Sequence, residues 1–182
     1  MHTIPSQRGG ASGIGGFKGI VSALAMNASG LLAAGTFNRW VGLYDTRLGG
    51  TTNAIFSLEG LGKNDNATVG KGTGITQLLW SSCSRYLCVA ERGSDGIGVW
   101  DIRGSGQRLA WLRGRKALTP QRLGAEIVGG EVWAGGLDGV VKAWEGIGMT
   151  QGVVEPSWEF KAHDGESNIS PQRSSIAVLI EW

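Results

Sequence analysis

Histidine and cysteine are scarce in this 182-residue sequence. Their scarcity argues against several common kinds of metal-binding and catalytic site. Its two histidines are His2 and His163, and its two cysteines are Cys83 and Cys88. These four residues never cluster with the spacing of a zinc site. No histidine is placed to serve a Ser-His or Cys-His nucleophile pair. We therefore expect no metal, no cofactor, no small-molecule substrate and no enzyme activity.

Long apolar runs and proline are also in short supply. No stretch approaches the roughly 18 consecutive apolar residues of a membrane span, so we expect no contact with a membrane. Residues 1–16 are rich in glycine and serine and lack the apolar core of a signal peptide, so they are expected to form a flexible lead. The two cysteines, five residues apart, are expected to stay unpaired, which fits a reducing compartment.

Glycine and tryptophan, in contrast, are abundant. The chain has 32 glycines and eight tryptophans, and 41% of its residues are hydrophobic. An apolar fraction of this size argues against disorder. Glycine, tryptophan and short apolar runs together indicate many short strands joined by tight turns, which is an all-β fold.

One sequence pattern occurs three times. Residues 95–101 read Asp-Gly-Ile-Gly-Val-Trp-Asp, and related stretches occupy residues 38–45 and 138–145. Asp95-Gly96 predicts a two-residue type I′ hairpin turn with positive φ at both residues. In the strand that follows, Ile97 and Val99 point to one face and Trp100 to the other.

Each copy of the pattern is the third strand of a four-strand unit. The Trp-Asp-type endings at Asp45, Asp101 and Glu145 lie 56 and 44 residues apart, and a polar insert at residues 60–72 lengthens the first interval. The expected strands are residues 19–25, 31–35, 38–45 and 52–58 in unit one, 74–80, 86–90, 95–101 and 108–112 in unit two, and 122–128, 131–135, 138–145 and 157–161 in unit three.

A period of roughly 40–45 residues with four strands is typical of WD-repeat β-propellers. His163 occupies the place of the Gly-His element of a WD unit. The predicted fold is an incomplete propeller at residues 17–164, with about three four-stranded blades and the start of another, followed by a divergent tail at 165–182. An antiparallel sandwich with similar-looking strands is the alternative.

Two features resemble a phosphate-binding loop and catalytic carboxylates, but both have structural explanations. Residues 70–74, Gly-Lys-Gly-Thr-Gly, fail as a phosphate loop because Lys71 is followed by glycine and no helix follows. Asp95 and Asp138 recur at the same place in their units, so they are interpreted as turn residues and not as general acids.

A run of basic residues is the strongest functional signal. Residues 102–125 contain six basic residues and no acidic one: Arg103, Arg108, Arg113, Arg115, Lys116 and Arg122. Arginine suits phosphate recognition because its fork can bind two oxygens at once. The run is therefore a candidate RNA-binding site. The alternative is a solvated basic face balanced by Glu126, Glu131 and Asp138.

Several short motifs resemble the telomerase Cajal body protein 1 family of WD-repeat proteins, including fungal relatives linked to splicing. They lie at residues 19–25, 42–44, 74–76, 100–103, 119–122 (Thr-Pro-Gln-Arg) and 156–163. The resemblance adds Thr119 and Gln121 to the candidate RNA-binding residues. It implies a nuclear scaffold that binds box H/ACA-type Cajal body and telomerase RNA, works with ribonucleoprotein proteins and helps to localise their particles to Cajal bodies; a cytoplasmic pool is also allowed.

Two alternatives to this function stay open. One is a protein-interaction scaffold of the splicing machinery without direct RNA contact. The other is a truncated, inactive fragment, since three units fall short of the four to eight blades that propellers use.

Overall fold

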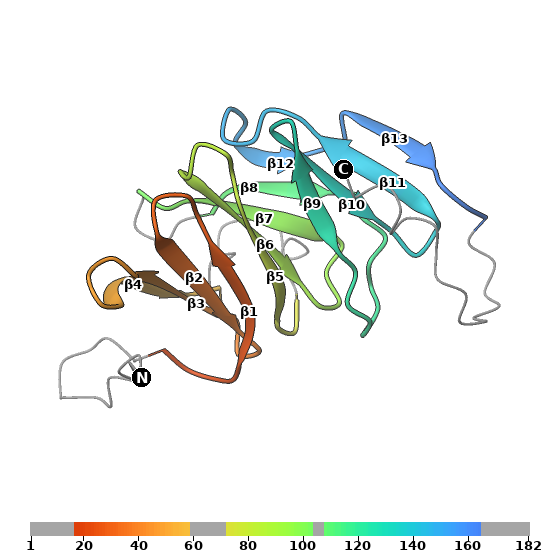
Figure 1. The fold of residues 1–182 in the computed structure, drawn as a ribbon. Coiled ribbons are helices and arrows are strands. Elements are labelled where there is room, and N and C mark those ends of the chain that lie inside the picture. The colour runs from red at the N-terminus through yellow and green to blue at the C-terminus, as the bar shows by residue number, and fades with distance from the viewer. Residues whose placement is uncertain (1–16, 59–71, 104–107, 165–182) are drawn as a thin grey trace.

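Three sheets follow one another along the chain, and Figure 1 shows them side by side as three successive blades. The computed structural model describes residues 17–58, 72–103 and 108–164, and the regular structure of these ranges is all β-strand. The predictions for residues 1–16, for most of the insert and for the tail at 165–182 lie outside the described residues.

Every strand predicted for the three units is present. Blade one contains β1 (Val21–Met26), β2 (Leu31–Thr36), β3 (Trp40–Asp45) and β4 (Thr51–Ser57). Blade two contains β5 (Ile75–Trp80), β6 (Tyr86–Glu91), β7 (Gly96–Asp101) and β8 (Arg108–Arg113). Blade three contains β9 (Ala125–Val128), β10 (Glu131–Gly135), β11 (Val140–Trp144) and β13 (Trp158–Lys161). Neighbouring strands of each blade pair antiparallel in this order.

One further strand was not predicted. β12 (Gly152–Val154) lies in the connection between β11 and β13 of blade three, but it pairs with β8 of blade two. The pairing is parallel, with Val153 opposite Trp111. Blade two is therefore a five-stranded sheet whose outermost strand comes from the next blade.

The turns before the third strands differ from the type I′ prediction, which is wrong. Gly96 already belongs to β7, and the positive φ of the β6–β7 connection is at Gly93. The corresponding turns have positive φ at Arg39 and Gly139. Each connection is thus longer than two residues and needs one left-handed residue. Asp138 has the predicted turn role, because its Oδ1 accepts a hydrogen bond from the backbone N–H of Val140 at 3.3 Å.

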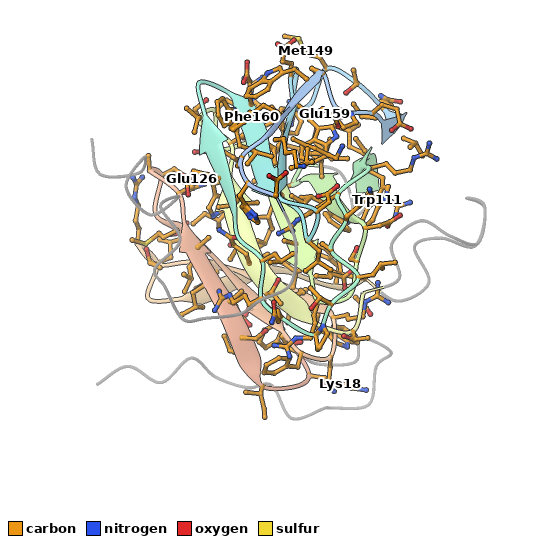
Figure 2. All side chains as sticks on the ribbon, turned by 90° about the vertical axis from the view of Figure 1, so that its right-hand side faces the viewer. Lys18, Trp111, Glu126, Met149, Glu159 and Phe160 are labelled. Atoms are coloured by element: carbon orange, nitrogen blue, oxygen red, sulfur yellow. The ribbon has the colours of Figure 1, made fainter. Side chains whose placement is uncertain are left out.

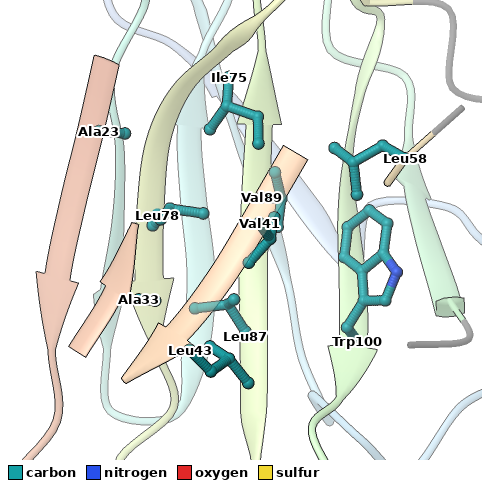
Figure 3. Close-up of a cluster of buried hydrophobic side chains, with 10 residues drawn as sticks. All are labelled: Ala23, Ala33, Val41, Leu43, Leu58, Ile75, Leu78, Leu87, Val89 and Trp100. Atoms are coloured by element: carbon teal, nitrogen blue, oxygen red, sulfur yellow. The ribbon is translucent and has the colours of Figure 1, made fainter. Parts of the chain in front are cut away.

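The predicted alternation of β7 is confirmed by the core, which lies in two layers between blades. Trp100 belongs to the cluster between blades one and two, where it lies with side chains such as Val41 and Leu87 (Figure 3). Ile97 and Val99 belong to the cluster between blades two and three. Blade two therefore buries both of its faces.

Two glycines allow aromatic side chains to lie flat on their own strand. A Cβ at Gly98 would come within 2.2 Å of the Trp100 ring, and one at Gly42 within 2.6 Å of Tyr44. The indole and the phenol therefore cover the glycine two residues earlier on the same face. This explains why the pattern Gly-x-aromatic-Asp occurs in both β3 and β7.

Both cysteines are free, as predicted. Complete burial raises the pKa of Cys88 to about 12. Cys83 is exposed, and its hydrogen bond with Ser81 lowers the pKa of its thiol. Cys83 is therefore the more reactive thiol.

Candidate interaction site

The predicted basic run is divided between two opposite ends of blade two. The register pairs Arg108, at the start of β8, with Trp100 near the end of β7, whereas Arg113 pairs with Gly96 at the beginning of β7. Arg103, just after β7, therefore lies at the Arg108 end, while the residues from Arg113 onward lie at the other. The structure does not bring the run together as one cluster.

Three of the basic side chains are engaged in ion pairs on the surface. Arg103 binds Asp101 through an N–O distance of 2.6 Å, and this hydrogen bonding lowers the pKa of Asp101 to about 2. Arg113 pairs with Glu155. Lys116 lies 3.4 Å from a carboxylate oxygen of Asp138. The acidic partner of Arg113 is distant in sequence, so the acid-free run gave no sign of it.

Arg115 has a structural position. The residue is only 2% exposed, and its Nε and Nη2 donate to the backbone carbonyls of Gly135 and Gly124, both at 3.0 Å. Burial lowers the pKa of its guanidinium to about 10, so the group is still charged at neutral pH. Arg115 ties the connection between blades two and three to blade three, and it cannot reach a phosphate from there.

The other predicted site residues have mixed environments. The Arg108 guanidinium lies 5.4 Å from the centroid of the Trp111 ring. The hydroxyl of Thr119 accepts a hydrogen bond from the backbone N–H of Gln121 at 3.1 Å. Gln121 and Arg122 are exposed. An RNA-binding role for these exposed residues stays a prediction.

A second surface, which the sequence did not reveal, lies at the end of the blades where the third strands begin. We call it the turn face. It consists of the connections at residues 37–39, 92–95 and 136–139, joined by residues 114–124. Backbone hydrogen bonds hold these segments together: Gly93 donates to Thr119 at 3.2 Å, and Leu137 donates to Lys116 at 2.7 Å.

Large apolar side chains project from the turn face. Phe37, Leu118 and Leu137 are all exposed, and Leu118 has a relative exposure of 73%. Ile20 is exposed beside them, since its carbonyl accepts from the backbone N–H of Phe37. Isolated exposed leucines are ordinary, but several on one rigid face are typical of a binding surface.

A buried ion pair fixes the turn face between blades one and two. Arg39 donates through Nε to Glu91 at 2.6 Å and through Nη2 at 3.1 Å, and the Glu91 side chain is 3% exposed. Next to it, the Arg92 guanidinium lies 5.8 Å from the centroid of the Phe37 ring. The surface is therefore held in place by contacts that join different blades.

Two findings in the described residues concern metal sites and membrane-spanning helices. Within residues 17–58, 72–103 and 108–164, no group of three or more His, Cys, Asp or Glu side chains could hold a metal ion. The same ranges contain no helix with the length and hydropathy of a membrane span.

Comparisons with solved structures identify the fold. The chain is similar to the β-propeller domain of Cps50 (Swd1) from Myceliophteria thermophila, with a TM-score of 0.52, 22% identity, and coverage of 74% of this chain and 36% of that one. It is also similar to a chain of the Mitotic Checkpoint Complex, with a TM-score of 0.56, 19% identity, and coverage of 79% and 37%. The fold is an incomplete WD-repeat β-propeller, and the sandwich alternative is wrong.

One curated protein provides a sequence relative. The chain is 34% identical over 130 residues to the "Guanine nucleotide-binding protein negative regulator 1" of Schizosaccharomyces pombe. The match covers 70% of this chain but only 30% of that protein. No protein-family model matches the chain. These comparisons support the WD-repeat part of the predicted resemblance, and the assignment to the telomerase Cajal body family stays a prediction.

Proposed function

We propose that this chain acts as a non-catalytic propeller scaffold that binds a protein partner on its turn face. The observation that carries this proposal is the set of exposed apolar side chains, Phe37, Leu118 and Leu137, on connections that hydrogen bonds and a buried ion pair hold rigidly. Apolar side chains on a preorganised surface can bind without a large ordering cost.

The charges around these side chains define the partner further. Exposed Lys18 lies 6.0 Å from the centroid of the Trp40 ring, directly after the connection at residues 37–39, and exposed Arg122 belongs to the segment at residues 114–124. The carboxylates of Glu91 and Asp138 already have basic partners. A partner with an apolar patch and an acidic rim would complement this surface. A guanine nucleotide-binding protein is the first candidate, because the fission yeast relative is named as a negative regulator of one.

Leu118→Asp is expected to weaken partner binding at least tenfold, because it places a charge in the middle of the apolar contact. The measurement is biolayer interferometry of the purified chain against a guanine nucleotide-binding protein of Schizosaccharomyces pombe, the organism of the curated relative. The guanine nucleotide-binding protein is loaded with GDP or with GTP. Met149→Asp is the matched control, since Met149 is also exposed but lies in the β11–β12 connection. Equal loss in both variants, or no binding of the wild type, would contradict the proposal.

RNA binding is the second candidate, and the exposure of Arg113, Lys116 and Arg122 favours it. The ion pairs of Arg113 and Lys116 are on the surface, where such pairs contribute about 0–1 kcal/mol, so phosphates could replace the acidic partners. The nuclear location and the box H/ACA RNA expected from the family resemblance belong to this candidate.

If RNA binds there, replacing Arg113, Lys116 and Arg122 together with alanine should reduce the slope of log affinity against log salt by about 2, since up to three phosphate contacts are lost. Filter binding of a box H/ACA RNA at several salt concentrations measures this slope. Arg103→Ala, at the other end of β8, should leave it unchanged. An affinity that ignores salt, or survives the triple change, would rule this surface out.

A further inference from the structure

One face of the blade-three sheet points away from blade two. Val132 and Trp144 belong to the cluster shared with blade two, so the residues that alternate with them lie on the opposite side. We call this side the free face of blade three, and no other sheet of the described ranges packs on it. Its main side chains are Glu126 and Val128 of β9, Glu131 and Trp133 of β10, and Trp158 and Phe160 of β13.

The matching positions of the other blades show how a blade junction is built. By register, Trp133 takes the place of Ala33 in blade one and of Cys88 in blade two. Both of these small residues are completely buried, because the next blade packs on them. An indole at this position fills the space that a neighbouring sheet would occupy. The free face of blade three is therefore not built as a blade junction.

Charge marks the same difference. Glu126 corresponds to Ala25 of blade one and to Leu79 of blade two. It is exposed, and no lysine or arginine of the described ranges pairs with it. The strand positions on this face include a second acid, Glu131, and no basic residue. Burying an unpaired carboxylate against an apolar sheet is costly, so an apolar partner does not suit this face.

Three aromatic rings lie next to these acids. Figure 2 views the molecule from the side of blade three and labels Glu126 and Phe160. Trp133 contacts Trp158 in a T-shaped arrangement with centroids 4.5 Å apart, and Trp158 stacks with Phe160 at 5.9 Å. The Nε1 of Trp133 donates to Glu131 at 2.9 Å, which fixes the indole. Both indoles are half-buried and Phe160 is 43% exposed, so part of each ring stays open to solvent.

We propose that the free face of blade three binds an arginine side chain from a basic segment of a partner protein. A guanidinium can stack on an indole and can also donate two hydrogen bonds to a carboxylate. Glu126 and Trp133 are paired directly across β9 and β10, so their Cβ atoms lie about 5 Å apart. Glu131 adds a second carboxylate beside the same indole. The turn face suits a partner with an acidic rim, so the two surfaces select different partners.

The first test is the affinity of the full chain for a fluorescein-labelled peptide of alternating glycine and arginine. Fluorescence anisotropy should show saturable binding, and Glu126→Gln should weaken it about fivefold because a surface ion pair is lost. Glu155→Gln is the matched control, since it removes the same charge from the pair with Arg113. This control should leave the affinity unchanged. An equal loss in both variants, or a wild type that does not bind, would overturn the proposal.

A peptide with lysine in place of arginine separates stacking from net charge. It should bind about threefold more weakly, because an ammonium group lacks the planar fork that stacks on an indole and binds a carboxylate through two bonds. Equal affinities of the two peptides would show that charge alone is recognised, which would contradict the part assigned to the rings.

The indole N–H signals in a nitrogen-15 correlation spectrum locate the peptide. The signals of Trp133 and Trp158 should shift when the arginine peptide is added, and the three Trp→Phe variants at 133, 144 and 158 assign the resonances. The signal of Trp144 should stay in place, because this side chain is completely buried and donates to the carbonyl of Arg113. Shifts confined to other tryptophans would overturn the assignment. Leu118→Asp should keep the Trp133 and Trp158 shifts, so failure of the turn face is distinguishable from failure of this surface.

Discussion

Glu91→Gln is expected to lower the free energy of unfolding by about 3 kcal/mol, although it only replaces one carboxylate oxygen with an amide nitrogen. Glu91 is buried between blades one and two, and both of its carboxylate oxygens bind Arg39. Glu91→Gln removes the negative charge that faces the largely buried guanidinium of Arg39, and breaking such a pair from one side is costly. Urea unfolding followed by circular dichroism measures the loss.

Glu155→Gln is the matched control for this change. Glu155 also pairs with an arginine, Arg113, but both side chains are more than half exposed. Water and salt screen such a pair, so the unfolding midpoint should not move measurably. If the two substitutions had the same effect, the Arg39–Glu91 contact would have no special part in joining the blades.

Trp144→Ala is expected to cost about 4 kcal/mol, since a large buried ring is removed from the cluster between blades two and three. Trp144 is fully buried, and its Nε1 donates to the carbonyl of Arg113 at 3.2 Å. The same urea titration measures the effect. A cooperative wild-type transition would also argue against the inactive-fragment alternative.

One further variant separates the hydrogen bond of Trp144 from the packing of its ring, and a variant of Trp133 is the control. Trp144→Phe keeps most of the ring but leaves the Arg113 carbonyl without its donor, and about 1–2 kcal/mol should be lost. Trp133→Phe, on the free face of blade three, should have a smaller effect, because Trp133 is only half-buried. An equal loss for Trp133→Phe and Trp144→Ala would contradict the assignment of the core to the blade junctions.

The strands could be predicted because local patterns determine them. Alternation along β7 places Ile97 and Val99 on one side and Trp100 on the other whatever the rest of the chain does. The repeated Trp-Asp-type ending then aligns the three units. The reason for Gly98 was not visible, since nothing in a sequence says that an indole two residues later lies flat over it.

The candidate site was harder to predict, because charge partners come from distant segments. Arg113 and Arg115 are two residues apart and look alike in the sequence. One pairs with Glu155 on the surface, and the other is buried on the carbonyls of Gly124 and Gly135. Likewise, the turn face joins three blades, so no single stretch shows that Phe37, Leu118 and Leu137 share a surface.

The pairing of β12, from blade three, with the edge strand of blade two affects the order in which the blades unfold. Blades two and three share a sheet as well as a core, because Val153 of β12 pairs with Trp111 of β8. Blade one has no such strand exchange with blade two in the described residues. Amide hydrogen exchange should therefore show blades two and three opening as one cooperative unit, with blade one opening first. The same feature determines where the chain could be divided into shorter proteins. Division between blades two and three would remove β12 and leave β8 as an unpaired edge strand, whereas division between blades one and two would leave every described sheet whole.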